Sequence, residues 1–212
     1  MPNDFEQHLE RLCNLARELG ATNAKAFEAE DVVVDERVRL KCQIPICDDY
    51  GINLMCPPHI GMTVSDFARI VSKYQVALLL QIDCPIPHEM QQLIKSETGY
   101  VTNLYQNNAF LASYHDSFTQ AKMKLHEIVH KVESAAFSMG YRFAVGFIGG
   151  SCRLCAECVG ISSNEPCRHP FRARPSMEAM GIDVIQTATN AGLPFDIPPK
   201  ETAVWNGLVL VD

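Results

Sequence analysis

The segment from Cys152 to Pro170 constrains this chain more than any other, because it carries four cysteines in the pattern C-x2-C-x2-C-x8-C. A single tight loop can turn the thiolates of Cys152, Cys155 and Cys158 toward a common centre, and Cys167 can close a fourth corner. Thiolates are soft ligands that select iron–sulfur clusters, zinc or copper. Three cysteines at two-residue gaps are typical of bacterial [4Fe–4S] loops, whereas structural zinc sites usually have two separated C-x2-C pairs. We therefore predict a [4Fe–4S] cluster bound by these four residues, with zinc as the alternative.

A second cysteine-rich loop lies earlier in the chain, over residues 42–59. Cys42, Cys47 and Cys56 follow the pattern C-x4-C-x8-C, and the prolines, aspartates and glycine around them oppose regular structure. Irregular backbone lets amide groups face the sulfides of a cluster, and the two prolines after Cys56 restrict the motion of the loop. We predict a second metal site at these three cysteines, with a second [4Fe–4S] cluster as its favoured occupant.

The fourth ligand of this earlier site is not evident from the spacing. His59 lies three residues after Cys56, and Cys84 lies at the end of an expected strand and precedes a proline, so each is a candidate. A third alternative is that the protein supplies no fourth ligand, which would leave one iron open to a substrate or a small thiol. The plain alternative for His59 is a solvated loop histidine.

Composition limits the classes of partner and the compartment. The chain has 212 residues, 47% of them hydrophobic, and a net charge of −7. Such an acidic chain has no general electrostatic attraction for nucleic acid or an anionic membrane, and no apolar run approaches the ~20 residues of a membrane helix. No signal peptide is evident, so the nine cysteines are expected to hold metal rather than disulfides. We expect a soluble cytoplasmic protein that forms a single domain over residues 1–212.

Hydrophobic periodicity predicts a sheet packed with helices. Helical spacing marks residues 4–19, 63–74 and most of 87–139, and short helices are expected after Ser176 and over residues 183–190. Strands are expected over residues 25–34, 37–41, 75–82, 141–148 and 203–211. The apolar run 75–82 is typical of a central strand buried on both faces. This order of elements predicts an α/β or α+β fold with a mixed sheet, in which both cysteine-rich loops (residues 42–59 and 149–170) follow strands.

Three arginines, Arg168, Arg172 and Arg174, form a local basic cluster directly after the last cysteine of an otherwise acidic chain. Their guanidinium groups could bind a small anionic substrate near the cluster. The alternative, which we favour, is ion pairing with carboxylates such as Glu165 and Glu178, because arginine–carboxylate pairs are common.

The long helical segment contains the pentapeptide HEIVH, which has the H-E-x-x-H pattern of zinc proteases. In such a site His126 and His130 would bind zinc and Glu127 would activate water. The pattern is short, and the nearby lysines indicate a solvated helix face. We therefore interpret it as the polar face of a packing helix.

These motifs together resemble a family of bacterial and archaeal cysteine-rich proteins described as predicted metal-binding proteins. The resemblance rests on the CPPH, CRLCAEC and CRHP motifs and on RPSMEAMGIDV, and it extends from about Arg37 to the C-terminus. The resemblance implies iron–sulfur binding by Cys152, Cys155, Cys158 and Cys167. It also implies a second metal site at Cys42, Cys47 and Cys56. It implies no particular reaction.

The favoured function is electron transfer by an iron–sulfur protein together with a redox partner protein. The segment GFIGGSC lacks the G-x-G-x-x-G form, so no flavin or nicotinamide site is indicated and electrons are expected to come from another protein. One alternative is an enzyme that uses an open iron at Cys42, Cys47 and Cys56 for substrate or sulfur chemistry. Another is a protein whose loops are held by structural zinc. The sequence leaves open whether the chain is an enzyme and which residues would be catalytic.

Overall fold

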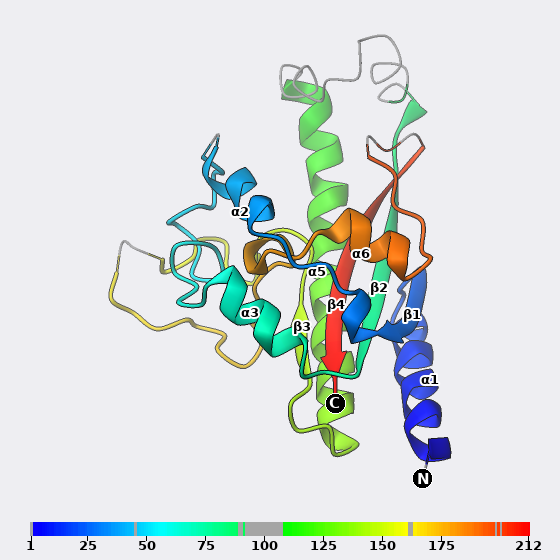
Figure 1. Cartoon of the computed structure of the whole chain (residues 1–212). Helices are drawn as coiled ribbons and strands as arrows, with labels where there is room; N and C mark the ends of the chain where they lie inside the picture. Colours follow the sequence, from blue (N-terminus) through cyan, green and yellow to red (C-terminus); the bar gives the residue numbers. More distant parts are fainter. Residues whose placement is uncertain are drawn as a thin grey trace.

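The computed structural model describes residues 2–44, 46–88, 91, 108–160, 163–197, 199 and 201–212. Within these residues four strands form one sheet in the order β1-β2-β4-β3 (Figure 1). They are β1 (Asn23–Glu28), β2 (Val76–Pro85), β3 (Val145–Phe147) and β4 (Thr202–Val211). The expected α+β fold is thereby confirmed.

The expected mixed sheet is antiparallel in all of its described ladders. Parallel neighbours need a crossover that carries the chain to the opposite end of the sheet. Here the connection from β1 to β2 returns the chain to the end where β1 stops, because Glu28 lies opposite Val76. The longest ladder joins β2 to β4 over the full length of both strands.

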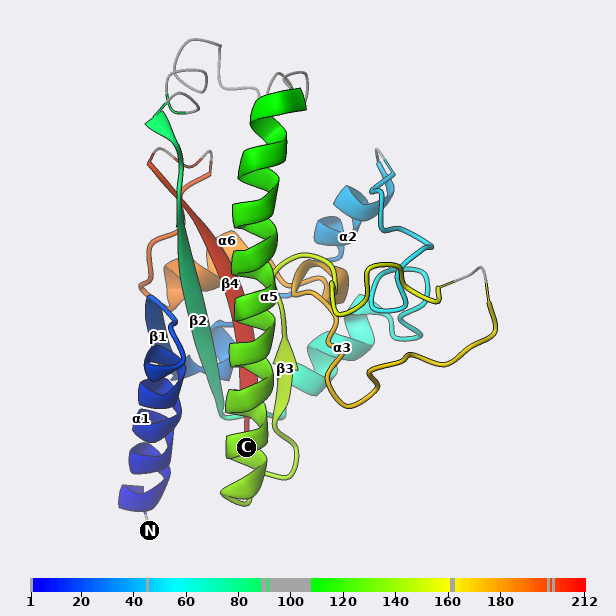
Figure 2. The same cartoon turned by 180° about the vertical axis from the view of Figure 1, so that it is seen from behind.

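Helices cover both faces of this sheet (Figures 1 and 2). α1 (Pro2–Glu18) and α5 (Asn108–Ser138) lie on one face, and α3 (Val64–Val71), α6 (Val184–Asn190) and the 3-10 turn η3 (Glu178–Met180) lie on the other. The core on the first face includes Leu12, Leu78, Leu80, Leu125, Val129 and Val209. The core on the second face includes Phe67, Ala77, Leu79, Met177, Ile182 and Leu208. Successive residues of β2 thus enter opposite cores, as predicted for a central strand.

Two of the predicted helices have an N-terminal capping side chain. The hydroxyl of Thr63 accepts a hydrogen bond from the backbone N–H of Asp66 at the start of α3, and the Asp183 carboxylate accepts one from Gln186 at the start of α6. The helix predicted over residues 87–139 is confirmed as α5 in its second part. Residues 89–90 and 92–107 of that prediction lie outside the described residues.

The strand predicted over residues 37–41 is wrong, because this segment is helix α2 (Glu36–Gln43). The alternation of basic and apolar residues suggested a strand, but the Asp35 carboxylate accepts a hydrogen bond from the N–H of Arg37 and begins a helix. No residue of α2 is buried. The first cysteine-rich loop therefore begins in the last turn of a helix, which carries Cys42, whereas the second follows β3 as predicted. The other strand predictions hold in part, since β1 ends at Glu28 before the 3-10 turn η1 (Ala29–Asp31) and β3 is shorter than expected.

Candidate metal centre

The two cysteine-rich loops lie side by side, beyond the edge of the sheet that β3 forms (Figures 1 and 2). Two side-chain contacts join them. The Nδ2 group of Asn53 donates a hydrogen bond to the carbonyl oxygen of Cys152 over 2.9 Å, and Arg153 forms an ion pair with Asp49 at 2.9 Å. Cysteine motifs that are distant in the sequence thus become neighbours in the fold.

Two backbone contacts tighten this junction. The N–H of Leu54 donates a hydrogen bond to the Sγ atom of Cys158, with 3.5 Å between nitrogen and sulfur. Gly160 packs so closely on the other loop that an added Cβ atom would lie 1.9 Å from the carbonyl oxygen of Ile52. Its φ of +36° also lies in the left-handed region, so only glycine suits this position.

Cys42, Cys47 and Cys56 of the first loop lie close enough for their thiols to influence one another. Burial raises the pKa of Cys56 to about 12, and Asp49 and the other two thiols add to this shift. Burial also raises the pKa of Cys42, with further contributions from Cys47 and Glu178. Without a metal, the thiols of Cys42 and Cys56 are therefore neutral at pH 7, and metal binding must displace their protons.

The four cysteines of the second loop form another interacting group. Burial raises the pKa of Cys152. The thiols of Cys167, Cys158 and Cys155 raise it further. The N–H of His169 donates a hydrogen bond to the Sγ atom of Cys167 over 3.4 Å. All four cysteines are partly buried, so this group is shielded from solvent without being sealed.

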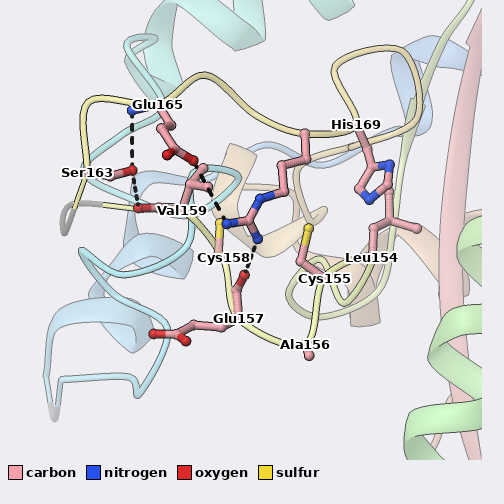
Figure 3. Close-up of a pocket in the computed structure, with 10 residues that line it drawn as sticks. Leu154, Cys155, Ala156, Glu157, Cys158, Val159, Ser163, Glu165 and His169 are labelled. Atoms are coloured by element: carbon pink, nitrogen blue, oxygen red, sulfur yellow. Dashed lines mark hydrogen bonds and ion pairs between the residues drawn. The ribbon is translucent and has the colours of Figure 1, made fainter.

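A cavity of about 540 Å³ opens beside the second group (Figure 3). Cys155, Cys158 and Glu165 line this cavity, and the sulfur atom of Cys158 points towards Glu165. Arg168 also lines the cavity, and it donates a hydrogen bond to the carbonyl oxygen of Glu157 over 3.1 Å. Its guanidinium therefore lies against the segment between the two cysteines, 3.9 Å from the carboxylate of Glu165.

The three arginines of the predicted cluster have different surroundings. Arg174 forms a two-point ion pair with Glu133 of α5, at 2.6 and 2.8 Å, and both side chains are largely buried. The favoured interpretation, carboxylate pairing, is thus confirmed for Arg174, although with a carboxylate that the sequence did not single out. It is also confirmed for Arg168, which pairs with Glu165 as predicted. Arg168 and Arg172 are exposed, so they are the members of the cluster that could still meet an anion.

The two histidines of the HEIVH segment differ, because only His126 has a hydrogen-bond partner among the described residues, whereas the buried Nδ1 atom of His130 has none there. His126 is buried, and its Nε2 atom donates a hydrogen bond to the carbonyl oxygen of Arg172 over 2.7 Å. Burial lowers the pKa of His126, which keeps the ring neutral. Glu127 forms a surface ion pair with Lys131 at 2.8 Å. The interpretation as a packing helix with a polar face fits Glu127, whereas His126 fastens the segment after the second loop to α5.

The two candidates for a fourth ligand in the first loop have different places. His59 stays within the loop, and its Nε2 atom donates a hydrogen bond to the carbonyl oxygen of Gly51 over 3.2 Å. Cys84 is buried in β2 opposite Ala203, and burial alone raises its pKa. His59 therefore lies with the first loop, whereas Cys84 lies in the sheet. The identity of the fourth ligand stays a prediction.

The sulfur donors of both groups are of the type that a soft metal prefers. The distances between them, however, are not yet those of a metal site. Across the described parts of the chain, no group of three or more cysteine, histidine or acidic side chains is spaced to hold a metal ion. The nine cysteines are all free thiols, and seven of them belong to the two groups. The residues therefore fit a thiolate-bound metal in their chemistry, and the thiols must lose protons and draw together when they bind it.

Sequence reasoning misjudged Lys122, which is one of the lysines taken to indicate a solvated helix face but is partly buried in the structure. Its ammonium group lies 4.4 Å from the centre of the Trp205 ring. Burial and then the charge of Arg153 lower the pKa of Lys122, against opposing contributions from Asp49 and Glu178. A lysine within an apolar stripe was the signal for this residue. No sequence signal marked Asn53, because its role depends on a distant loop.

Comparison with known proteins identifies one family. A sequence model of that family, described as "Predicted metal-binding protein (DUF2284)", matches residues 25–211, which include both cysteine-rich loops. Comparison with curated proteins and with solved structures finds no match. In the part of the chain that the structure describes, none of the helices has the length and apolar character needed to cross a membrane.

Proposed function

This chain belongs to the family of predicted metal-binding proteins, and from that premise we propose that it is an iron–sulfur protein that transfers electrons. One [4Fe–4S] cluster is bound by the second loop and another by the first, through Cys152, Cys155, Cys158 and Cys167, and through Cys42, Cys47 and Cys56. Bound clusters of this kind accept and release single electrons. A partner protein supplies those electrons.

The observation that carries this proposal is the gathering of seven thiols into two groups in adjoining loops. Backbone N–H groups from Leu54 and His169 donate to the sulfur atoms of Cys158 and Cys167. Hydrogen bonds to sulfur are one of the means by which proteins set cluster potentials. The free state of all nine cysteines supports a reducing compartment, for which we propose the cytoplasm.

Anaerobic purification followed by analysis of iron, acid-labile sulfide and zinc tests this proposal. We expect a brown protein with broad visible absorbance and about eight irons per chain. Cys167→Ala should lose at least the iron of the second group. Cys13→Ala is the control, because it removes a buried thiol of α1 that belongs to neither group, and it should keep the iron content of the natural protein.

The metal analysis also separates the alternatives. A colourless protein that carries zinc on the same cysteines would overturn the iron–sulfur proposal and support zinc that holds the loops in place. A protein that binds neither metal under anaerobic conditions would overturn metal binding altogether.

A second candidate function is enzymatic, and the surroundings of the first loop favour it. Lys122 interacts electrostatically with Cys47, and Glu178 interacts with Cys42. The Oε2 atom of Glu178 is buried and has no hydrogen-bond partner among the described residues. A small substrate with an anionic group and a hydrogen-bond donor would satisfy both Lys122 and Glu178. Three cysteines leave one metal position free, where the metal could act on that substrate as a Lewis acid.

EPR spectra of the loaded protein, recorded with and without glycolate or a small thiol, test the enzymatic candidate. An open iron should respond to these additions, and Lys122→Met should weaken the response to glycolate. Lys124→Met is the matched control, because Lys124 lies on the same helix but is exposed. A signal that no addition changes would argue against an open iron and leave electron transfer as the function.

A further inference from the structure

Asn53 connects the first group of cysteines to the second through a short chain of hydrogen bonds. Its backbone carbonyl accepts a hydrogen bond from the N–H of Cys56 over 2.9 Å. Its Nδ2 group donates to the carbonyl oxygen of Cys152 over 2.9 Å, and its Oδ1 atom accepts from the N–H of Met55 over 3.0 Å. Asn53 is only 3% exposed, so its amide donor is buried, and losing that donor would leave the carbonyl oxygen of Cys152 without this partner.

The residues beside Asn53 extend this contact. The N–H of Leu54 donates to the Sγ atom of Cys158, and the carbonyl oxygen of Ile52 lies against Gly160. Three successive residues of the first loop therefore form part of the surroundings of the second group. Cys56 is hydrogen-bonded directly to Asn53. A movement of Cys56 towards a metal must therefore also move residues 52–54, which contact the second group.

We propose that Asn53 is a positioning residue that couples the two metal sites, so that filling of the first site promotes filling of the second. The inference rests on the proposed metal binding, and it applies whether the metal is iron or zinc. Because coupling of binding equilibria is reciprocal, a filled second site also favours filling of the first. The two sites therefore load as a pair rather than independently.

Asn53→Asp is the sharpest variant, because its carboxylate can still accept from the N–H of Met55 but can no longer donate to Cys152. Asn164→Asp makes the same chemical change at an exposed position of the second loop and is the matched control. Losing the hydrogen bond that the buried Asn53 donates to Cys152 should weaken metal binding at the second site by roughly fivefold to twentyfold. We expect Asn164→Asp to bind metal as the natural protein does. Both variants should keep the natural far-UV circular dichroism spectrum.

Metal content and, where the metal is iron, EPR spectra of Cys56→Ala give a second measurement of the coupling. This variant removes a ligand of the first site and leaves the four cysteines of the second site intact. Coupled loading predicts that it loses more than half of the metal and that the remaining EPR signal changes. A variant that keeps half of the metal with an unaltered signal, together with unchanged binding in Asn53→Asp, would overturn the coupling while metal binding itself stood.

The contact between the loops that carries this coupling can be tested without metal, which separates the failure of the coupling from that of the proposed function. In chelator-treated protein, the rate at which iodoacetamide alkylates Cys152 and Cys158 can be followed by mass spectrometry. Asn53→Asp should raise these rates by about fivefold relative to Asn164→Asp, since the first loop no longer holds the second in place. Equal rates in the two variants would show that Asn53 does not couple the loops, even if the protein proved to bind no metal.

Discussion

Replacing Gly160 with alanine tests how tightly the two loops are packed. The added Cβ atom would lie 1.9 Å from the carbonyl oxygen of Ile52, whereas carbon and oxygen in contact are separated by about 3.3 Å. The loops would have to part by more than an ångström, and overpacking of this kind costs about 1–3 kcal/mol. The left-handed backbone of Gly160 adds about 1–2 kcal/mol for any residue with a Cβ atom. We expect a total loss of about 3 kcal/mol and a fall in Tm of roughly 6–12 °C.

Two other glycines separate the clash from the backbone strain. Gly140 has a φ of +103° but nothing within 4 Å of an added Cβ atom, so Gly140→Ala should show the strain alone, about 1–2 kcal/mol. Gly61 has neither a positive φ nor a close neighbour. Gly61→Ala should therefore change the free energy of unfolding by no more than ~0.5 kcal/mol.

Thermal unfolding of the reduced, chelator-treated proteins, followed by far-UV circular dichroism, compares the three variants. The same variants should then be loaded with metal, and we expect Gly160→Ala alone to bind less of it. If Gly160→Ala unfolds at the same temperature as Gly140→Ala, the clash with Ile52 does not exist. The reasoning that the loops form one packed unit would then be refuted.

Three further predictions concern stability. Arg174→Met should cost about 2–4 kcal/mol in urea unfolding, because it leaves the buried carboxylate of Glu133 unpaired, and adding Glu133→Gln should recover part of that loss. The metal-free protein should lose stability as the pH rises from 9 towards 12, by up to about 1.4 kcal/mol per pH unit, since the folded state raises the pKa of Cys56 and binds its proton more tightly than the unfolded chain does. In Cys56→Ala this alkaline slope should be reduced; an unchanged slope would contradict the assignment. Asp183→Ala should destabilise the protein by about 1 kcal/mol, because it removes the cap that accepts from the N–H of Gln186, and Asp183→Asn should largely restore the stability.

Elements that depend on local patterns were predictable from the sequence. The apolar run that became β2 is long enough and apolar enough to require burial on both faces, and Thr63 and Asp183 supply caps for helices that begin directly after them. The segment that became α2 was misjudged because its alternation suits a strand, while none of its residues is buried against the rest of the protein. Where no tertiary burial supports a periodicity, a capping residue such as Asp35 can decide the local structure.

The sequence by itself determined which atoms could bind a metal and in what groups, since the reach of a thiol within a short loop depends on a few intervening residues. It also determined membership of a family of predicted metal-binding proteins. Only the tertiary structure decided that the two loops are in contact, that Asn53 joins them and that Glu133 forms an ion pair with Arg174. The physical reason is that each of these contacts joins residues far apart in the chain. Such pairs are brought together by the packing of helices on both faces of the sheet, and no local pattern encodes that packing.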